Sequence, residues 1–291
     1  MKLLFALAHY YKPKPGAFYG SEGADPARRA TAVAACIASL HHAFDAHQGL
    51  LDGQARVAHP ANDRDPLEVS VIVCTAGDAH LVPQLQGIKH MFSHRPCQRD
   101  PKLLGLECRA ALGEGIGRYD YFCYLEDDLM LTDPLFFDKL AWFRSIAGAD
   151  AVLQPNRYEV AVGQPLYKLY IDGNMADASQ SPKFQDIADR PLIEGEAMGR
   201  KYLFKRVNNP HSGTFFLDAR QMAHFAQQPD FLAEESGFAG PVESCATLGI
   251  MRHFRVYKPA RINAGFLEVR HLNNRYLGAR MKFKPGNPLR F

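Results

Sequence analysis

Three short apolar runs in the first half of the chain constrain its fold more than any other feature. They lie at 3–10, 69–74 and 119–125, and each is followed directly by polar side chains. A continuous apolar run of this length is typical of a strand buried on both faces of a parallel sheet. Segments with apolar residues at helical spacing, such as 26–44 and 103–112, separate the runs. This alternation predicts an α/β fold, a three-layer αβα sandwich around a mostly parallel sheet.

Local signals place further elements along the chain. Asp25 precedes Pro26, which predicts an N-cap followed by proline in the first turn of the 26–44 helix. Thr132-Asp133-Pro134 predicts the start of another helix that runs to about Ile146. Short strands are expected at 151–153, 215–217, 255–259 and 265–269, helices at 219–227 and 242–253, and loops at 49–66 and 175–200.

The composition excludes several classes of protein. With 291 residues, 47% of them hydrophobic and 22% charged, the chain has enough apolar material for a large core and is not an extended disordered segment. Its 34 Lys and Arg residues against 31 Asp and Glu residues give a formal charge of +3. That balance argues against a protein that coats nucleic acid.

The six cysteines show no C-x-x-C spacing, and Cys74 and Cys123 stand inside apolar runs. They are predicted to be free, buried thiols rather than disulfides, which favours a cytoplasmic protein. The apolar stretch Leu3–Ala8 is shorter than the core of a secretion signal, so it is expected to be a strand. No segment approaches the ~18 apolar residues of a membrane span.

An acidic triplet, Glu126-Asp127-Asp128, stands between the third apolar run and Leu129-Met130-Leu131. Carboxylates ~6 Å apart repel by roughly 3 kcal/mol at an effective dielectric constant near 20, so a proton, an arginine or a divalent cation must compensate. Hard oxygen ligands suit Mg²⁺ or Mn²⁺, which take one or two carboxylates plus substrate phosphates. A solvated turn is the alternative. The apolar residues on both sides, and the position at the carboxyl end of a strand, favour a ligand site.

The segment YDYFCYLEDDLMLTDPLFFDKL (119–140) resembles the DxD segment of GT-A glycosyltransferases, which transfer a sugar from a nucleotide donor. Its amino-acid sequence is especially similar to that of the inverting N-acetylglucosaminyltransferase I family. The helix and glycine break before it are similar as well, so the resemblance covers about 103–156. It implies a GT-A-like fold, a divalent metal (Mn²⁺ or Mg²⁺) and a nucleotide-diphosphate donor, most simply a UDP-sugar.

The resemblance also implies roles for particular residues. Asp128 would bind the metal that holds the diphosphate, Glu126 and Asp127 would contact the ribose or the sugar, and Arg109 would face the donor. His9 and Tyr10 after the first run, and Thr75 and Asp78 after the second, would lie near the nucleotide, although packing explains them equally well.

The second half offers three further candidates in the order that the family uses. Ser212-Gly213 resembles the glycine segment that faces the donor sugar, with a plain turn as the alternative. Glu243 matches the position of the general base, although a first-turn acid would also be favoured by the helix dipole, and Glu234 and Glu235 compete with it. His271 matches the C-terminal histidine on the metal, with a surface or hydrogen-bonded polar histidine as the alternative.

The resulting hypothesis is a metal-dependent, inverting glycosyltransferase of polysaccharide biosynthesis, acting on a hydroxyl of a glycan or glycolipid. A single domain is expected, with a nucleotide-binding half (1–131) and an acceptor-binding half (132–291). The basic tail, with Arg275, Arg280, Lys282, Lys284 and Arg290, is either a solvated terminus or a peripheral contact with an anionic membrane. A nucleotidyltransferase that makes sugar nucleotides and a metal-dependent carbohydrate-binding protein are the alternatives.

Overall fold

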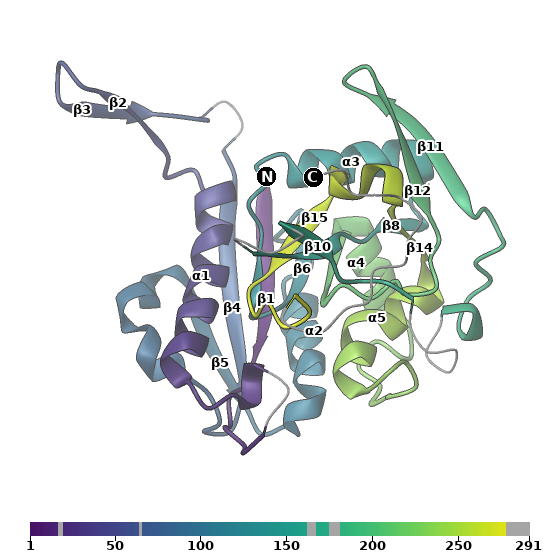
Figure 1. Ribbon diagram of the computed structural model, residues 1–291, viewed down its shortest axis with the longest axis horizontal. Helices are drawn as coiled ribbons and strands as arrows, with labels where there is room; N and C mark the ends of the chain where they lie inside the picture. The colour runs from purple at the N-terminus through teal and green to yellow at the C-terminus, as the bar shows by residue number, and fades with distance from the viewer. Residues whose placement is uncertain (17–19, 64–65, 162–166, 175–180, 278–291) are drawn as a thin grey trace.

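The computed structural model, which describes residues 1–16, 20–63, 66–161, 167–174 and 181–277, confirms the α/β sandwich (Figure 1). The central sheet has the order β13-β6-β1-β4-β5. Four of its strands are parallel and β13 alone is antiparallel to its neighbour. The strands are β1 (Lys2–His9), β4 (Glu68–Ala76), β5 (Ser93–Cys97), β6 (Tyr121–Glu126) and β13 (Thr214–Asp218).

Strand β1 lies at the centre of this sheet, and its side chains alternate between two cores. Leu3, Phe5 and Leu7 pack with α1 (Pro26–Phe44) and α3 (Phe136–Ala147). Leu4 and Ala6 pack on the opposite face with α2 (Leu104–Glu114), α4 (Ala219–Ala226) and α5 (Pro241–His253). Because both faces are covered by helices, the strand is apolar at successive positions instead of alternating with polar residues.

Helix α1 begins and ends where the sequence predicts. The Asp25 side chain caps it by accepting a hydrogen bond from the backbone N–H of Arg28 at 2.9 Å. Helix α3 begins later than expected, at Phe136. The reason is that Asp133 accepts from the backbone N–H of Leu135 at 3.0 Å in the turn that precedes the helix.

Two smaller sheets complete the molecule. One has the order β10-β9-β15-β7 and the other β11-β12-β14-β8. Their strands are β7 (Leu129–Met130), β8 (Ala151–Leu153), β9 (Asn156–Val160), β10 (Lys168–Tyr170), β11 (Leu192–Ala197), β12 (Arg200–Lys205), β14 (Arg255–Pro259) and β15 (Glu268–His271). The pairing of β7 with β15 sets Leu129 opposite His271 and so joins the segment after the acidic triplet to the C-terminal part of the chain. β15 starts three residues later than predicted because a 3₁₀ helix occupies Arg261–Phe266.

Two predicted loops contain hairpins, so those predictions were wrong. Residues 49–66 hold β2 (Gly49–Asp52) and β3 (Val57–Pro60), which project from the sandwich beyond α1 and β4 (Figure 1). Within 175–200 lie β11 and the start of β12, joined by Met198 and Gly199, both at positive φ. Residues 175–180 fall outside the described part. Neither hairpin has the clean polar–apolar alternation that marks a half-buried strand.

All six cysteines are free, and five of them are buried, as the sequence predicts. Among the described residues, no helix is long and apolar enough to cross a bilayer.

The central aromatic packing gives a direct test of the sandwich. Phe5 is fully buried, with its ring 6.3 Å from that of Phe44 and 6.2 Å from that of Phe137. Phe5→Ala should lower the free energy of unfolding by about 3–5 kcal/mol, the usual cost of an aromatic cavity. Leu50→Ala, on the exposed β2, should change it by no more than about 0.5 kcal/mol. Urea denaturation followed by the fluorescence of the single tryptophan, Trp142, measures both, and equal effects would contradict this packing.

Candidate functional site

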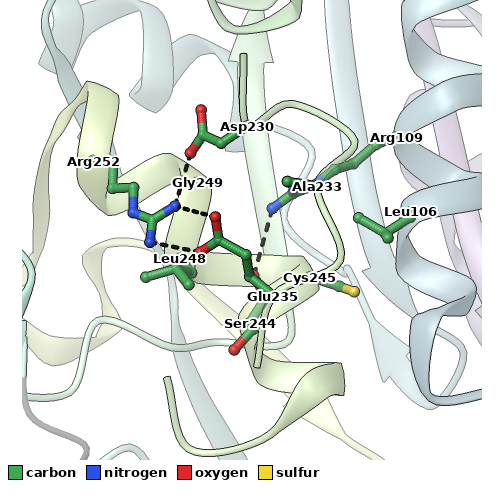
Figure 2. Close-up of a pocket in the computed structure, with 10 residues that line it drawn as sticks. All are labelled: Leu106, Arg109, Asp230, Ala233, Glu235, Ser244, Cys245, Leu248, Gly249 and Arg252. Carbon is green, nitrogen blue, oxygen red and sulfur yellow. Dashed lines mark hydrogen bonds and ion pairs between the residues drawn. The ribbon is translucent and has the colours of Figure 1, made fainter. Parts of the chain in front are cut away.

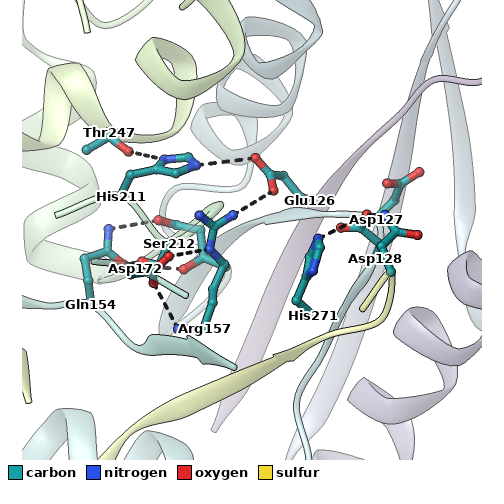
Figure 3. A network of polar contacts seen from close by, with 12 residues as sticks. Glu126, Asp127, Asp128, Gln154, Arg157, Asp172, His211, Ser212, Thr247 and His271 are labelled. Carbon is teal, nitrogen blue, oxygen red and sulfur yellow. Dashed lines mark hydrogen bonds and ion pairs between the residues drawn. The ribbon is translucent and has the colours of Figure 1, made fainter. Parts of the chain in front are cut away.

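The acidic triplet lies where the carboxyl ends of the parallel strands meet (Figure 3). Glu126 is the last residue of β6 and stands beside Ala8 of β1. Asp127 and Asp128 form the turn into β7 and are only 3% and 7% exposed. A solvated turn is therefore ruled out, because both carboxylates are held within the protein and need partners there.

His9, at the end of β1, holds Asp127. Its Nδ1 lies 2.5 Å from Asp127 Oδ2, and its Nε2 lies 2.8 Å from the backbone nitrogen of Leu81. Because that backbone N–H can only donate, Nε2 accepts, and Nδ1 carries the proton that is donated to Asp127. The neighbouring Tyr10 is half-buried and packs on the core beneath α2.

Arg29 of α1 bridges the two aspartates, an interaction that the sequence analysis missed. Its Nη1 donates to Asp128 Oδ2 at 2.8 Å, and its Nη2 donates to Asp127 Oδ1. Burial opposes the ionisation of Asp128, but the charge and hydrogen bond of Arg29, with the charge of His271, hold its pKa below the ordinary value. Asn273 Nδ2 donates to the same Asp128 oxygen at 2.6 Å.

His271 faces Asp128 from β15. Its Nε2 lies 3.8 Å from Asp128 Oδ2, and its Nδ1 lies 2.8 Å from Oε1 of the buried Glu159. Burial works against the ionised form of Glu159, but hydrogen bonds from His271 and from the backbone of Leu277 and Tyr276 lower its pKa. The carboxylate therefore accepts the Nδ1 proton and orients the ring with Nε2 toward Asp128, so that the imidazole in its neutral form would offer its Nε2 lone pair to a cation there.

These two atoms fit a divalent cation. Two ligand atoms that share an ion at about 2.1 Å lie at most about 4.2 Å apart, and Asp128 Oδ2 and His271 Nε2 satisfy that limit. Within the described part of the chain, no group of three or more His, Cys, Asp or Glu side chains could hold an ion alone. The remaining ligands would have to be water and substrate oxygens, the usual arrangement for Mg²⁺ in phosphate sites.

Glu126 lies in a separate polar environment beside the aspartates. Its carboxylate is 3.6 Å from Arg157 Nη1 and 3.7 Å from His211 Nε2. Burial raises its pKa to about 7, with Arg157 opposing the shift and the charges of Asp128 and Glu243 adding to it. Gly213, at φ +64°, passes so close that a Cβ there would lie 2.5 Å from Glu126 Oε2.

A buried ion cluster of Arg157, Asp172 and Lys258 lies next to Glu126, and Figure 3 shows Asp172 and Arg157 beside it. The Asp172 carboxylate accepts hydrogen bonds from Arg157 Nε at 2.8 Å and from Lys258 Nζ at 2.6 Å. Lys258 Nζ also donates to the backbone oxygen of His211 at 2.7 Å. Burial alone would raise the pKa of Asp172, but Arg157 and Lys258 lower it to about 2. Ser212, next to His211, is fully buried and donates to Gln154.

The remaining predicted residues lie in several places. Thr75 is buried at the end of β4, with Oγ1 2.8 Å from His94 Nε2, and Asp78 is exposed in the turn that follows. Glu243 is half-buried in the first turn of α5, and its charge acts on Glu126. The competing Glu235 forms an ion pair with Arg252.

Arg109 occupies a different environment, at a pocket that Leu106 of α2 and several α5 residues line (Figure 2). It donates to the backbone oxygens of Phe231 at 3.0 Å and Ser244 at 3.4 Å, and its guanidinium lies over the Phe225 ring. None of these partners belongs to the acidic triplet, so the expected contact of Arg109 with a donor stays a prediction.

The loop after β1 contributes a second pocket, of about 440 Å³, lined by Pro13, Lys14, Pro15, Gly16, Gly23 and Ala24. The Tyr11 hydroxyl donates to the backbone oxygen of Gly23 at 2.7 Å and thereby ties the two sides of the loop together.

No protein-family profile matches the sequence, and no curated protein sequence does either. Among solved structures, the chain is similar to S. aureus TarS (TM-score 0.44, 10% identity, 90% of this chain and 35% of TarS). It is also similar to TarS 1–349 in complex with UDP (TM-score 0.44, 11% identity, 89% of this chain and 57% of that one). A third similarity is to GalNAc-T7 with UDP, GalNAc and Mn²⁺ (TM-score 0.46, 11% identity, 99% of this chain and 44% of that one). The chain thus spans less than two thirds of each of these structures, from 35% to 57%.

Two glycines with the same backbone conformation test the contact with Glu126. Gly213 and Gly199 have φ values of +64° and +68°, but a Cβ meets nothing within 4 Å at Gly199. Gly199→Ala should cost about 1 kcal/mol of stability through backbone strain alone. Gly213→Ala should cost about 3 kcal/mol, because the methyl group must also displace the Glu126 carboxylate. Urea denaturation compares them, and equal costs would show that Glu126 does not press on this glycine.

The buried Asp172 predicts how stability depends on pH. Its pKa is about 2 in the folded protein against an ordinary 3.8, so the stability it contributes is present above pH 4 and is lost as the pH falls toward 2. Between pH 5 and pH 2.5 the wild type should lose roughly 2 kcal/mol more than Asp172→Asn. The variant itself should be about 3–5 kcal/mol less stable at pH 7, because it leaves Arg157 and Lys258 unpaired. Urea denaturation at both pH values measures this difference, and parallel losses would contradict it.

Proposed function

We propose that the protein is a metal-dependent glycosyltransferase of the GT-A type that moves a sugar from a nucleotide-diphosphate donor, a UDP-sugar, to a hydroxyl of a glycan or glycolipid, with inversion. The observation that carries the proposal is the approach of His271 Nε2 to Asp128 Oδ2 at 3.8 Å, with Glu159 orienting the imidazole. The GT-A resemblance implies this pair of ligands, and the pairing of β7 with β15 supports it because Leu129, which follows Asp128, stands opposite His271.

In this proposal Asp128 and His271 hold Mn²⁺ or Mg²⁺. When bound, such an ion stabilises the negative charge of a departing nucleoside diphosphate. The half 1–131, which contains Lys14 and the pocket in the loop after β1, would bind the nucleotide. The half 132–291 supplies His271 and Glu243 and would bind the acceptor.

The residues around Glu126 would bind the donor sugar. Gly213 has no side chain, so the backbone approaches Glu126 closely and leaves room on that side of the site. Glu126 has a pKa of about 7, so near neutral pH its carboxyl group can donate a hydrogen bond to a sugar hydroxyl or accept one from it. Asp127 is already held by His9 and Arg29, which favours a structural part for it beside any contact with ribose.

Glu243 is the proposed general base, which would take the proton from the attacking acceptor hydroxyl. In the described part of the chain it forms no ion pair, whereas Glu234 and Glu235 face Arg99 and Arg252. Its position in the first turn of α5, close enough for its charge to act on Glu126, is consistent with a base beside the donor sugar.

Contact of the basic tail with an anionic membrane or acceptor stays a prediction. Arg280, Lys282, Lys284 and Arg290 lie outside the described residues, and Arg275 is the one tail cation within them.

The function is tested by donor binding and transfer. A thermal-shift screen with Mn²⁺ should show that UDP, or another nucleoside diphosphate, raises the melting temperature, since a ligand that binds only the native state stabilises it. With the donor so identified, Asp128→Asn should reduce transfer by about 100-fold or more.

Asp133→Asn is the matched control, because Asp133 is a nearby aspartate that pairs with Lys139 away from the triplet. It should retain wild-type turnover. Normal turnover of Asp128→Asn would refute the assignment of the metal site. Release of pyrophosphate from a nucleoside triphosphate would instead identify a nucleotidyltransferase.

A further inference from the structure

The Asp128 oxygen that faces His271 already has two donors. Arg29 Nη1 lies 2.8 Å from Asp128 Oδ2, and Asn273 Nδ2 lies 2.6 Å from the same atom. One of these donors carries a permanent positive charge. A cation that binds Asp128 must therefore share this carboxylate with a guanidinium or displace it.

The fold holds both donors in place. Arg29 stands at the end of the first turn of α1, whose start is fixed by the Asp25 cap, and it is only 6% exposed. Its Nε is buried without an acceptor among the described residues, while its two terminal nitrogens reach Asp127 and Asp128. The guanidinium is thus held against the two carboxylates by its terminal nitrogens, although its buried Nε–H makes no hydrogen bond in that position.

Asn273 is fixed from the other side. A Cβ on Gly20 would lie 2.4 Å from Asn273 Nδ2, so the turn after β1 packs directly against this amide. The backbone N–H of Leu272 donates to the Asp128 carbonyl at 2.9 Å. Segments from both ends of the described chain therefore enclose Asp128.

We propose that Arg29 is a built-in competitor of the metal, which keeps the affinity for the cation low until a nucleoside diphosphate binds. This inference rests on the proposed function, and it makes the cation and the diphosphate bind as a pair. Arg29 is a positioning residue in this role, because it acts through Asp127 and Asp128.

The charges give the physical reason. With both aspartates ionised, Arg29 leaves the group with one net negative charge, and a divalent cation turns that into a net positive charge in a buried place. A diphosphate restores the balance by supplying negative oxygens to both cations. Binding of either ligand therefore favours the other, and the coupling is reciprocal.

The test measures Mn²⁺ binding by the loss of the free-ion EPR signal, with and without UDP, and so does not depend on turnover. Wild type should bind Mn²⁺ weakly alone and about tenfold or more tightly with UDP. Arg29→Met, which keeps the stem and removes the charge, should bind Mn²⁺ alone about tenfold more tightly than wild type and gain less from UDP. Arg29→Lys, which keeps the charge, should stay close to wild type.

Arg28→Met is the matched control, since Arg28 is the exposed neighbour whose guanidinium, among the described residues, donates to the backbone oxygen of Asn273 and to neither aspartate. It should leave both affinities unchanged. If Arg29→Met does not fold, Arg29→Met/Asp127→Asn keeps the wild-type net charge of −1 on these side chains and should still bind Mn²⁺ alone more tightly than wild type, because the guanidinium no longer occupies Asp128 Oδ2.

The outcomes separate the inference from the proposed function. Unchanged or weaker Mn²⁺ binding by the charge-removing variants, with Mn²⁺ and UDP still coupled in wild type, would overturn the role of Arg29 and leave the glycosyltransferase standing. No coupling between Mn²⁺ and any nucleoside diphosphate in wild type, together with no transfer, would overturn both.

Discussion

The structure depends on the compensation of two buried carboxylates at the end of β6. Asp127 and Asp128 are nearly inaccessible to solvent, and charges in such a place are tolerated only when they are paired and hydrogen-bonded. Their partners come from segments that lie far apart in the sequence. These partners are His9 of β1, Arg29 of α1, and His271 and Asn273 near the C-terminal end of the described chain. Forming this group therefore requires the central sheet, the helix beside it and the β7–β15 pairing together.

A second group of buried charges, formed by Asp172, Arg157 and Lys258, lies next to Glu126. Asp172 balances Arg157 and Lys258, and Arg157 in turn faces Glu126. Burial raises the pKa of Glu126 to about 7, and Arg157, which bonds Asp172 at 2.8 Å but lies 3.6 Å from Glu126, lowers that pKa by less than burial raises it. Asp128, with a pKa below its ordinary value, thus stands two residues from Glu126, with a pKa raised to about 7, and such a difference is a common way to give neighbouring acids different tasks.

Local features were predicted well from the sequence. The apolar run of β1, the Asp25 cap of α1 and the strand before the triplet each depend on residues within a few positions of one another, and the structure confirms them. The GT-A resemblance paired His271 with Asp128, and the structure brings His271 Nε2 within 3.8 Å of Asp128 Oδ2; that the two share a metal stays a prediction. Arg29 and Asn273 escaped detection because an arginine on an alanine-rich helix and an amide in a basic tail have no local signature; only the tertiary fold makes them partners of Asp128. The same holds for Asp172 and Lys258. The hairpin at 49–60 was missed because its exposed strands lack an apolar face.

The central claim is that Asp128 and His271 share a divalent cation with the diphosphate of a nucleotide. Anomalous diffraction at the manganese edge, from crystals soaked with MnCl₂ and UDP, tests this most directly. The account predicts one peak within about 2.2 Å of both Asp128 Oδ2 and His271 Nε2, with phosphate oxygens completing its coordination. A manganese ion bound with UDP elsewhere on the molecule, with Arg29 and Asn273 still on Asp128, would contradict it.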